Sequence, residues 1–400
     1  MITRYRRVLA VPALRRALLL GLLVRVPVFA GGIVITLHVV DDLGRSYGEA
    51  GVVAGAATVA IAVSGPWRGR LLDRRGLRKV VAPSLVVTAL CWSVAPFVGY
   101  WWLLALATLA GLFVIPTFSI IRQAVITAVP GEDRRTAISL DAVAVELSFM
   151  AGPALGVWAA TVWRTDLVLL VIQAGAVLAG VLLWVADPVL RAPDGEGEGA
   201  TAPPRSSWFR PGLVLVLLGA AACTVVLGGT DIAVVAALRD VGAASSIGLV
   251  LAVWGLGSLL GGLVYGGLHR SVNAFWLLGG LALFTAPLAL AGGPLSLGAL
   301  AFVAGLFCAP TITATIDQVS QAVPATARGE AMGWHGSSMT AGMALGAPAA
   351  GYVIDHAGWA AGFVAIAAIG VVVALAGLLV TTTRARSRRT APADPARAAA

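Results

Sequence analysis

One hydrophobic segment of this sequence occurs twice. Residues 110–117 read Ala-Gly-Leu-Phe-Val-Ile-Pro-Thr, and residues 304–311 read Ala-Gly-Leu-Phe-Cys-Ala-Pro-Thr, 194 positions later. The two halves also agree beyond this segment: Arg134 and Arg328 are separated by the same 194 positions. Both copies lie within long apolar stretches. A repeat of this length indicates two halves with the same fold, an arrangement typical of membrane proteins built from duplicated helical bundles.

The apolar stretches are long enough to cross a bilayer. Hydrophobic residues make up 59% of the chain and charged residues 12%, whereas a soluble domain carries about 25% charged residues. Runs of about twenty apolar residues span the hydrocarbon core as helices, and no alternating pattern of barrel strands occurs. We therefore expect an all-α membrane protein with twelve transmembrane helices. The expected spans are 17–40, 48–68, 80–98, 102–128, 137–161, 166–186, 212–236, 246–268, 274–291, 295–321, 330–354 and 359–380.

The basic residues are distributed unevenly around these spans. With the N-terminus inside, the cytoplasmic segments hold 22 of the 28 Lys and Arg residues, whereas the external loops hold three and the expected spans hold three. This bias predicts a multi-pass protein of the cell membrane with both termini in the cytoplasm. The net charge of +9 is therefore interpreted as a topology signal rather than as a nucleic-acid binding surface.

A polar segment divides the chain. Residues 187–211 are rich in Gly, Pro and acidic residues, which favours a flexible cytoplasmic linker. It separates an N-terminal six-helix bundle, 1–186, from a C-terminal six-helix bundle, 212–383, and the repeat predicts pseudo-two-fold symmetry between them. The basic, Ala- and Pro-rich tail at 384–400 is expected to be disordered.

The segment between the second and third spans carries a motif. It reads Gly-Arg-Leu-Leu-Asp-Arg-Arg-Gly-Leu-Arg-Lys over residues 69–79. A basic inside loop accounts for the arginines but not for the spacing of the glycines and the aspartate. The segment resembles the G-x-x-x-D-R-x-G-x-R-K loop of the major facilitator superfamily. The candidate gating residues are Gly69, Asp73, Arg74, Gly76 and Arg78.

The resemblance implies a specific role for Asp73. In that superfamily the aspartate lies at the N-terminus of the eleventh helix, whose positive dipole end attracts it, and the contact holds the two halves in the outward-facing state. Here the eleventh helix is expected to begin near Glu330. The second half has Arg270 in place of the aspartate. We therefore expect this contact, which we call the latch, only from the loop of the first half, and packing alone at the equivalent segment of the second half.

The fifth span contains a second motif. Gly152, Pro153 and Gly156 resemble the G-P-x-x-G motif that the superfamily associates with antiporters. Pro153 removes a backbone hydrogen bond and the glycines thin the helix, so the helix can bend and pack closely. The alternative is a packing kink without bearing on transport direction, and a second copy at Pro348 supports that alternative.

Ionisable residues occur inside the expected spans, where burial in lipid is costly. At 1.5 Å per residue, Arg25, Arg122 and Glu146 lie roughly 10–14 Å from the cytoplasmic face, so an Arg–Glu pair or cluster is one interpretation. Asp141 lies one turn closer to the cytoplasm. Snorkelling arginines and a static structural pair are the alternatives to a proton-coupling network of these four residues. His335 falls where Asp141 lies in the first copy and is interpreted as a helix-packing residue.

The resemblance also implies where a substrate binds. Helices one, four, seven and ten would line a central cavity between the halves, and the repeated octapeptide lies on two of them. Their faces are largely apolar, which suits a hydrophobic or amphipathic solute. Asp317 either contacts a cationic substrate or is solvated. The candidate cavity residues are Gly111, Pro116, Gly305, Pro310 and Asp317.

These observations predict a secondary transporter that works by alternating access. The chain resembles actinobacterial efflux-type members of the superfamily, so we expect proton-coupled export of a small molecule by a monomer in the lipid bilayer. The alternatives are a facilitator or proton symporter that imports a nutrient, and a membrane receptor that does not transport. No phosphate-binding loop and no catalytic or metal-ligating constellation occurs, so we expect neither an enzyme nor a cofactor, and H⁺ as the coupling ion.

Overall fold

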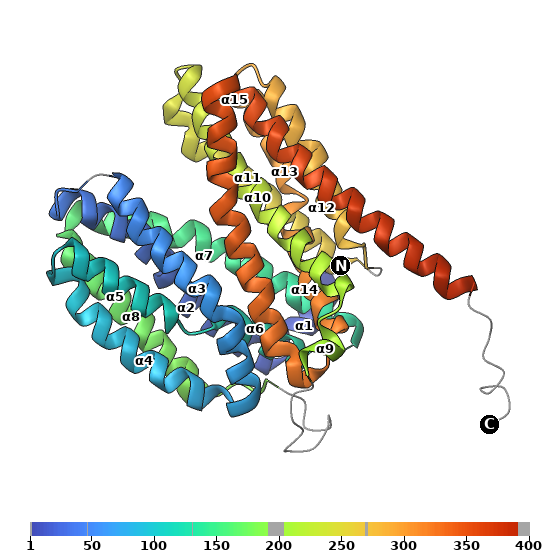
Figure 1. Cartoon of the computed structure of the whole chain (residues 1–400), viewed down its shortest axis with the longest axis horizontal. Coiled ribbons are helices and arrows are strands. Elements are labelled where there is room, and N and C mark those ends of the chain that lie inside the picture. Colours follow the sequence, from blue (N-terminus) through green and yellow to red (C-terminus); the bar gives the residue numbers. More distant parts are fainter. Residues whose placement is uncertain (1, 46, 130, 191–203, 269–270, 391–400) are drawn as a thin grey trace.

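The apolar runs form helices because a helix satisfies all its backbone hydrogen bonds internally, as a lipid environment requires. The computed structural model describes residues 2–45, 47–129, 131–190, 204–268 and 271–390, and no strand occurs in these ranges. Figure 1 shows two helical bundles, one formed by α2 to α8 and the other by α10 to α15. The expected all-α membrane fold is confirmed.

The N-terminal bundle follows the short helix α1 (Ile2–Leu9). Its helices are α2 (Pro12–Leu37), which continues into the π-helical turn η1 (His38–Asp42), α3 (Tyr47–Arg75), α4 (Leu77–Val94), α5 (Tyr100–Leu112), α6 (Thr117–Ala128), α7 (Arg134–Val162) and α8 (Thr165–Ala186). The C-terminal bundle follows α9 (Arg205–Trp208). Its helices are α10 (Pro211–Asp240), α11 (Ile247–Gly267), α12 (Ala274–Thr285), α13 (Pro294–Gly305), α14 (Cys308–Ala322) and α15 (Arg328–Thr390).

The helices account for twelve membrane spans. Ten segments of the described chain are long and apolar enough to cross a bilayer, and Ala274–Leu290 is a shorter apolar helix. One of the ten, Ala325–Thr381, contains two spans because Gly358 has a left-handed φ of 81° that interrupts α15. Two adjacent helices thus meet at Gly358 without an intervening loop. The chain is a multi-pass membrane protein.

The repeated octapeptide marks a break in a helix. Continuous helices were expected at 102–128 and 295–321, but α5 ends at Leu112 and α6 begins at Thr117, while α13 and α14 are separated by Leu306 and Phe307. Proline explains the position of each break, since Pro116 and Pro310 have no N–H to bond to the carbonyl four residues earlier. The two halves therefore share the same interruption of the fourth and tenth spans.

Three other expected boundaries differ. Residues 69–75, expected in a loop, form the last turns of α3, and only Gly76, with φ 77°, interrupts the helix before α4 begins. The linker contains α9, while its residues 191–203 lie outside the described residues. The tail expected to be disordered from 384 is helical to Thr390, because Arg and Ala favour helix and extend one that is already nucleated; residues 391–400 are not described.

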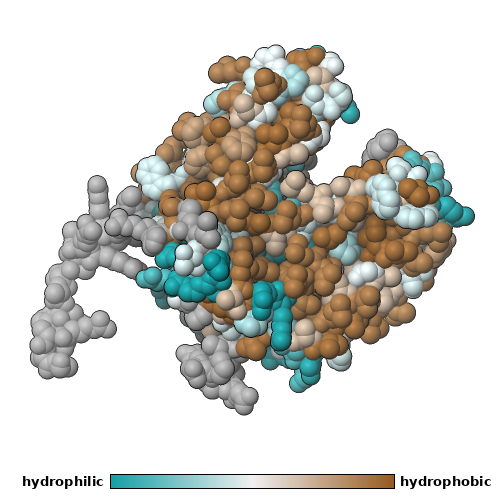
Figure 2. Space-filling view, turned by 180° about the vertical axis from the view of Figure 1, so that it is seen from behind, coloured by the Kyte–Doolittle hydropathy of each residue, from teal (hydrophilic) through white to brown (hydrophobic). Residues whose placement is uncertain are grey.

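The hydrophobic cores show how the two bundles meet. Among the described residues, one core combines residues of both halves, and three further cores each belong to a single half. We call the end with the shared core the closed end and the opposite end the open end. Figure 2 shows the predominantly hydrophobic surface, hollowed between the two bundles at one end. The shared core includes Ile120, Ile121, Ile316, Val319 and Met332.

Candidate functional site

A cluster of fully buried charges lies in the N-terminal bundle beside the other half. Arg25 on α2 and Asp141 on α7 are each 1% exposed, and Arg25 Nη1 donates to Asp141 Oδ1 at 2.7 Å. The Nε of Arg122, on α6, lies 4.0 Å from Asp141 Oδ2. Both guanidinium groups lie over the ring of Phe118, at 5.0 and 5.3 Å from its centroid. One carboxylate thus balances two buried cations.

The glycines of the fifth span bring the helices of this cluster together. A Cβ on Gly152 would lie 2.8 Å from the carbonyl oxygen of Val26, and one on Gly156 would lie 3.1 Å from that of Ala30. Only glycine permits α7 to approach α2 this closely. Pro153 lies between them inside α7. The motif therefore positions Asp141 against Arg25, whatever its bearing on the direction of transport.

Glu146 does not join this cluster. It is half-buried on α7 and forms no hydrogen bond or ion pair in the part of the chain that the structure describes. Its carboxylate faces α11, where Oε1 lies 3.6 Å from the position of a Cβ on Gly255, and it interacts electrostatically with Asp231 of α10. Five residues correspond to about 140° of rotation around a helix, so Asp141 and Glu146 face different neighbours. The expected Arg–Glu pair is replaced by pairing with Asp141.

Asp73 contacts the first turn of α15. Its Oδ1 accepts from the Gly329 N–H at 2.9 Å and its Oδ2 accepts from the Glu330 N–H at 2.8 Å. These amides have no partner within the helix, and the helix dipole adds to their attraction for a carboxylate. A Cβ on Gly69 would lie 2.2 Å from the Gly329 carbonyl oxygen, so the glycine permits this contact between halves.

The other residues of the expected gating motif have different positions. Arg74 is exposed at the end of α3, and Gly76 forms the turn between α3 and α4. Arg78 lies on α4, where it pairs with Asp187 at 3.0 Å and lies over the ring of Trp184. Arg78 therefore connects elements of the N-terminal half rather than the two halves.

The matching interface on the other side of the closed end is also hydrogen-bonded. Thr136 Oγ1 donates to the Gly266 carbonyl at 2.5 Å, and Ser139 Oγ donates to the Gly262 carbonyl. Packing alone was expected here, and that expectation is wrong, because hydroxyl groups on α7 satisfy backbone carbonyls of α11. Arg270 lies outside the described residues.

Asp317 lies in a contact between halves and not in a cavity. It is 6% exposed on α14, and its Oδ1 accepts from Arg134 Nε of α7 at 3.1 Å. Gln321 Nε2 donates to its other oxygen at 2.7 Å. The expected substrate contact or solvation is replaced by an ion pair, because α7 of the first half reaches across the closed end at this point.

The four other candidate cavity residues serve the packing within each half. A Cβ on Gly111 would lie 2.8 Å from the Ala57 carbonyl oxygen of α3, and one on Gly305 would lie 2.3 Å from the Trp254 carbonyl oxygen of α11. Both glycines are buried against a neighbouring helix of their own half. The two prolines lie next to the breaks in the fourth and tenth spans: Pro116 is the N-cap residue of α6, and Pro310 is the third residue of α14.

Sequence reasoning missed a fully buried side-chain contact between the halves. His335 of α15 is 0% exposed, and its Nδ1 lies 3.0 Å from Arg122 Nη1 of α6. Its Nε2 lies 3.0 Å from Thr315 Oγ1 of α14. Alignment of the two copies places His335 opposite Asp141 in sequence, and a polar residue at both aligned positions was the available signal. It is a partner of the charge cluster rather than a packing residue alone.

Two short helices reinforce the closed end. From α1, Arg4 Nη1 donates to the Leu268 carbonyl at 3.1 Å, Tyr5 donates to the Leu263 carbonyl, and Arg7 pairs with Asp133. Burial raises the pKa of the Tyr5 phenol, which keeps it a neutral donor. From α9, Arg205 pairs with Glu330, which Arg70 of α3 also approaches at 3.5 Å. The N-terminal helix thus binds across the junction, and the linker helix binds Glu330, which also approaches Arg70 of the first half.

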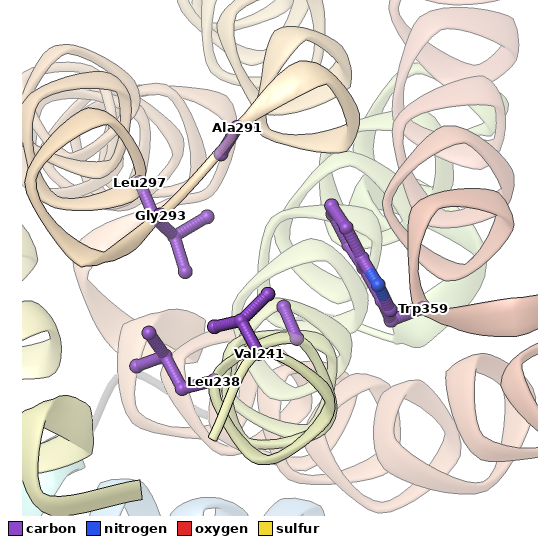
Figure 3. A pocket seen from close by; sticks show the side chains of 7 residues that line it. Leu238, Val241, Ala291, Gly293, Leu297 and Trp359 are labelled. Carbon is purple, nitrogen blue, oxygen red and sulfur yellow. The ribbon is translucent and has the colours of Figure 1, made fainter. Parts of the chain in front are cut away.

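A small pocket lies at the open end of the C-terminal bundle (Figure 3). It is formed by the ends of α10 and α13 and by Trp359 of α15, and it contains about 180 Å³ of empty space. This volume includes space open to solvent and is still below the roughly 300–1,000 Å³ of sites for drug-sized ligands, so the pocket is too small to enclose such a ligand. No group of three or more His, Cys, Asp or Glu residues that could hold a metal occurs among the described residues.

These features define a class of protein. Two equivalent helical bundles that meet at one end, separate at the other and carry buried charges at their junction are typical of alternating-access membrane transporters. A family model of the Major Facilitator Superfamily matches residues 17–233 and 226–400. The chain belongs to the Major Facilitator Superfamily and is a secondary transporter rather than an enzyme.

Solved structures share this fold. A bacterial homologue of the iron transporter ferroportin, in an outward-facing state, superposes with a TM-score of 0.74 at 14% identity, covering 93% of this chain and 98% of that one. The human organic anion transporter TETRAN has a TM-score of 0.67 at 16% identity, covering 91% and 99%. The transporter FucP in its outward conformation has a TM-score of 0.67 at 16% identity, covering 91% and 97%. No match to a curated protein sequence was found.

The latch predicts the effect of Asp73→Asn. The amide keeps the size of the side chain but removes its charge and turns one oxygen into a donor, which faces an N–H of α15. A hydrogen bond to a charged group contributes about 1.5–3 kcal/mol, so the closed end should weaken by roughly ten- to 150-fold in the equilibrium between states. Spin labels at Trp102→Cys and Leu295→Cys, both exposed at the open end, should report shorter distances as the open end closes. Unchanged distances would contradict the latch.

Proposed function

We propose that the chain is a proton-coupled transporter that exports a hydrophobic or amphipathic small molecule across the cell membrane. The observation that carries this proposal is the half-buried carboxylate of Glu146, which has no ion pair among the described residues and lies at the face of α7 toward the other half. A carboxyl group held in apolar surroundings without a cation changes its proton occupancy when its access to water changes. Alternating access supplies that change.

The distribution of basic residues supports the orientation. The closed end carries α1 and α9, whose basic residues include Arg4, Arg7 and Arg205, and positively charged segments favour the cytoplasmic side. In this orientation the termini are cytoplasmic and the structure is outward-facing. The hollow between the bundles then opens to the outside.

The surroundings of Glu146 support both the proposed substrate class and the proposed proton site. Glu146 lies beside Gly255 of α11, next to Met150 of its own helix. It also interacts electrostatically with Cys308 of α14. Apolar surroundings with few polar groups suit a hydrophobic or amphipathic solute. The nearby Asp231 of α10 is a second acid without an ion pair among the described residues. These two carboxylates come from different halves, so their separation changes when the halves move.

The test uses everted membrane vesicles with an imposed pH gradient. Addition of amphipathic probes, such as ethidium and rhodamine 6G, should dissipate the gradient when the protein is present. Glu146→Gln should reduce this dissipation to the level of vesicles without the protein, because glutamine binds no proton. Facilitated movement of a probe down its own gradient should persist. A pH-sensitive dye and probe fluorescence measure the two processes.

The matched control is Glu132→Gln, which changes an exposed glutamate of the same half. It should leave gradient dissipation unchanged. Intact gradient-driven transport by Glu146→Gln would show that Glu146 is not the proton site. Probe uptake into whole cells without gradient dissipation would instead support the facilitator or importer, and no movement of any probe would support a receptor.

A further inference from the structure

One contact between the halves joins two side chains that are both buried and both ionisable. Arg122 of α6 is 3% exposed and His335 of α15 is 0% exposed, and 3.0 Å separates Arg122 Nη1 from His335 Nδ1. Arg122 Nη2 also donates to Met339 Sδ of α15 at 3.9 Å. The contacts at Asp317, Thr136, Asp73 and Ser337 involve backbone groups or a partly exposed ion pair. This contact therefore connects the buried charge cluster of one half directly to a helix of the other.

The geometry determines the protonation state of His335. Arginine only donates hydrogen bonds, so the Nδ1 that faces it must be the unprotonated nitrogen that accepts. The proton of the neutral ring is then on Nε2, which donates to Thr315 Oγ1 at 3.0 Å, and the Thr315 hydroxyl donates in turn to the Ile312 carbonyl at 2.8 Å. In this series of hydrogen bonds from Arg122 to the Ile312 carbonyl, each donor has one acceptor and the imidazole is neutral.

A second proton on the ring is incompatible with the closed end. It would oppose an N–H of His335 to an N–H of Arg122 and bring two positive charges to 3.0 Å. The groups behind Arg122 are Asp141 on α7 and Arg25 on α2, so the cluster already carries one more cation than anion. Among the described residues, α14 contributes only the hydroxyl of Thr315 to the ring, and α3 and α10 contribute no charged contact.

We propose that His335 is a proton-operated switch of the closed end: the neutral ring accepts from Arg122 and holds the end shut, and a proton from solution binds the ring only after α15 has moved away from α6. Binding of H⁺ to Nδ1 uses the lone pair that accepts from Arg122, and closure releases that proton. This inference rests on the alternating-access part of the proposed function and not on its direction or coupling ion.

The sign of the pH dependence follows from linkage. Only the state with this end open binds the additional proton, so acidity favours opening of the closed end. With the ordinary imidazole pKa of about 6.5 for an accessible ring, the ratio of states should shift by about tenfold between pH 7.5 and pH 5.5. At neutral and higher pH the shift should be small.

The experiment measures distances between the open ends of the two halves. Spin labels at Trp102→Cys and Leu295→Cys, with the three buried native cysteines replaced by alanine, are read in lipid nanodiscs from pH 8 to pH 5.5 without substrate. The distance should shorten as the pH falls, with its midpoint near the imidazole range. His335→Gln should remove this transition, because its amide accepts from Arg122 and donates to Thr315 but binds no proton.

The controls separate this switch from other titrations. His356→Gln changes an exposed histidine of the same helix and should leave the transition intact. His335→Lys should favour the short distance at every pH. A transition that persists in a folded His335→Gln protein, or no transition in the protein with native His335, would overturn the proposal. These distance measurements do not depend on whether probes dissipate a pH gradient. Failure of this proposal can therefore be distinguished from failure of the proposed function.

Discussion

Asp141→Asn should destabilise the protein and abolish transport. Its carboxylate is the anion that balances the fully buried Arg25, and it is also the nearest anion to Arg122. Removal of one member of a buried ion pair leaves an uncompensated charge and typically costs about 3–5 kcal/mol. Thermal unfolding of the purified protein in detergent should show a clear loss, and gradient dissipation in everted vesicles should disappear.

A second variant separates stability from function. Arg25→Leu combined with Asp141→Asn removes the carboxylate and one of the two cations that it balances, while Arg122 stays buried without its nearest anion. Because an uncompensated buried charge is destabilising, the double variant should recover only part of the lost stability, and it should not recover transport. Asp355→Asn, which changes an exposed aspartate of α15, should affect neither property. If Asp141→Asn unfolds at the same temperature as the unmodified protein, the buried pair does not contribute as the structure indicates.

Gly69→Ala should prevent complete closure of the junction between the halves. The new Cβ would lie 2.2 Å from the Gly329 carbonyl oxygen, and a backbone atom cannot move away without shifting α15. Overpacking of this kind costs about 1–3 kcal/mol, which corresponds to roughly five- to 150-fold in the equilibrium between states. Labels at Trp102→Cys and Leu295→Cys should report the shorter open-end distance, and transport should fall in proportion.

Two glycines on the same helix provide graded controls. A Cβ on Gly65 would first meet the Ser337 hydroxyl at 2.7 Å, a side-chain atom that can rotate, so Gly65→Ala should have a smaller effect. A Cβ on Gly55 would meet nothing within 4 Å, and Gly55→Ala should leave the distance unchanged. Equal effects of all three variants would indicate a general response of α3 and contradict the steric explanation.

Much of the fold could be predicted from local patterns. Hydrophobic length identified the spans, and the repeated octapeptide identified the two halves. The repeat did not reveal that its copies break the fourth and tenth spans, because a single proline inside a transmembrane helix is compatible with a kink as well as with a break. The motif at 69–79 identified Asp73, whose hydrogen-bond donors were foreseeable because a helix N-terminus always presents free N–H groups.

The partners of the buried charges were not predictable in the same way. Depth in the membrane follows from counting residues, and it placed Arg25 and Glu146 at one level. Which side chain an arginine meets depends also on the rotation of each helix about its axis, and that rotation is set by the packing of several helices at once. The close approach of α7 to α2 at Gly152 turns Asp141 toward Arg25 and leaves Glu146 facing α11.

The amino-acid sequence therefore determined the membrane-spanning helices, their duplication and the residues that carry charge into the bilayer, because these follow from hydrophobicity and spacing along the chain. The tertiary structure decided which charges are paired and which contacts join the halves. It placed Asp317 against Arg134 and His335 against Arg122, residues about 180 or more positions apart, whose proximity depends on how two separate bundles close upon each other.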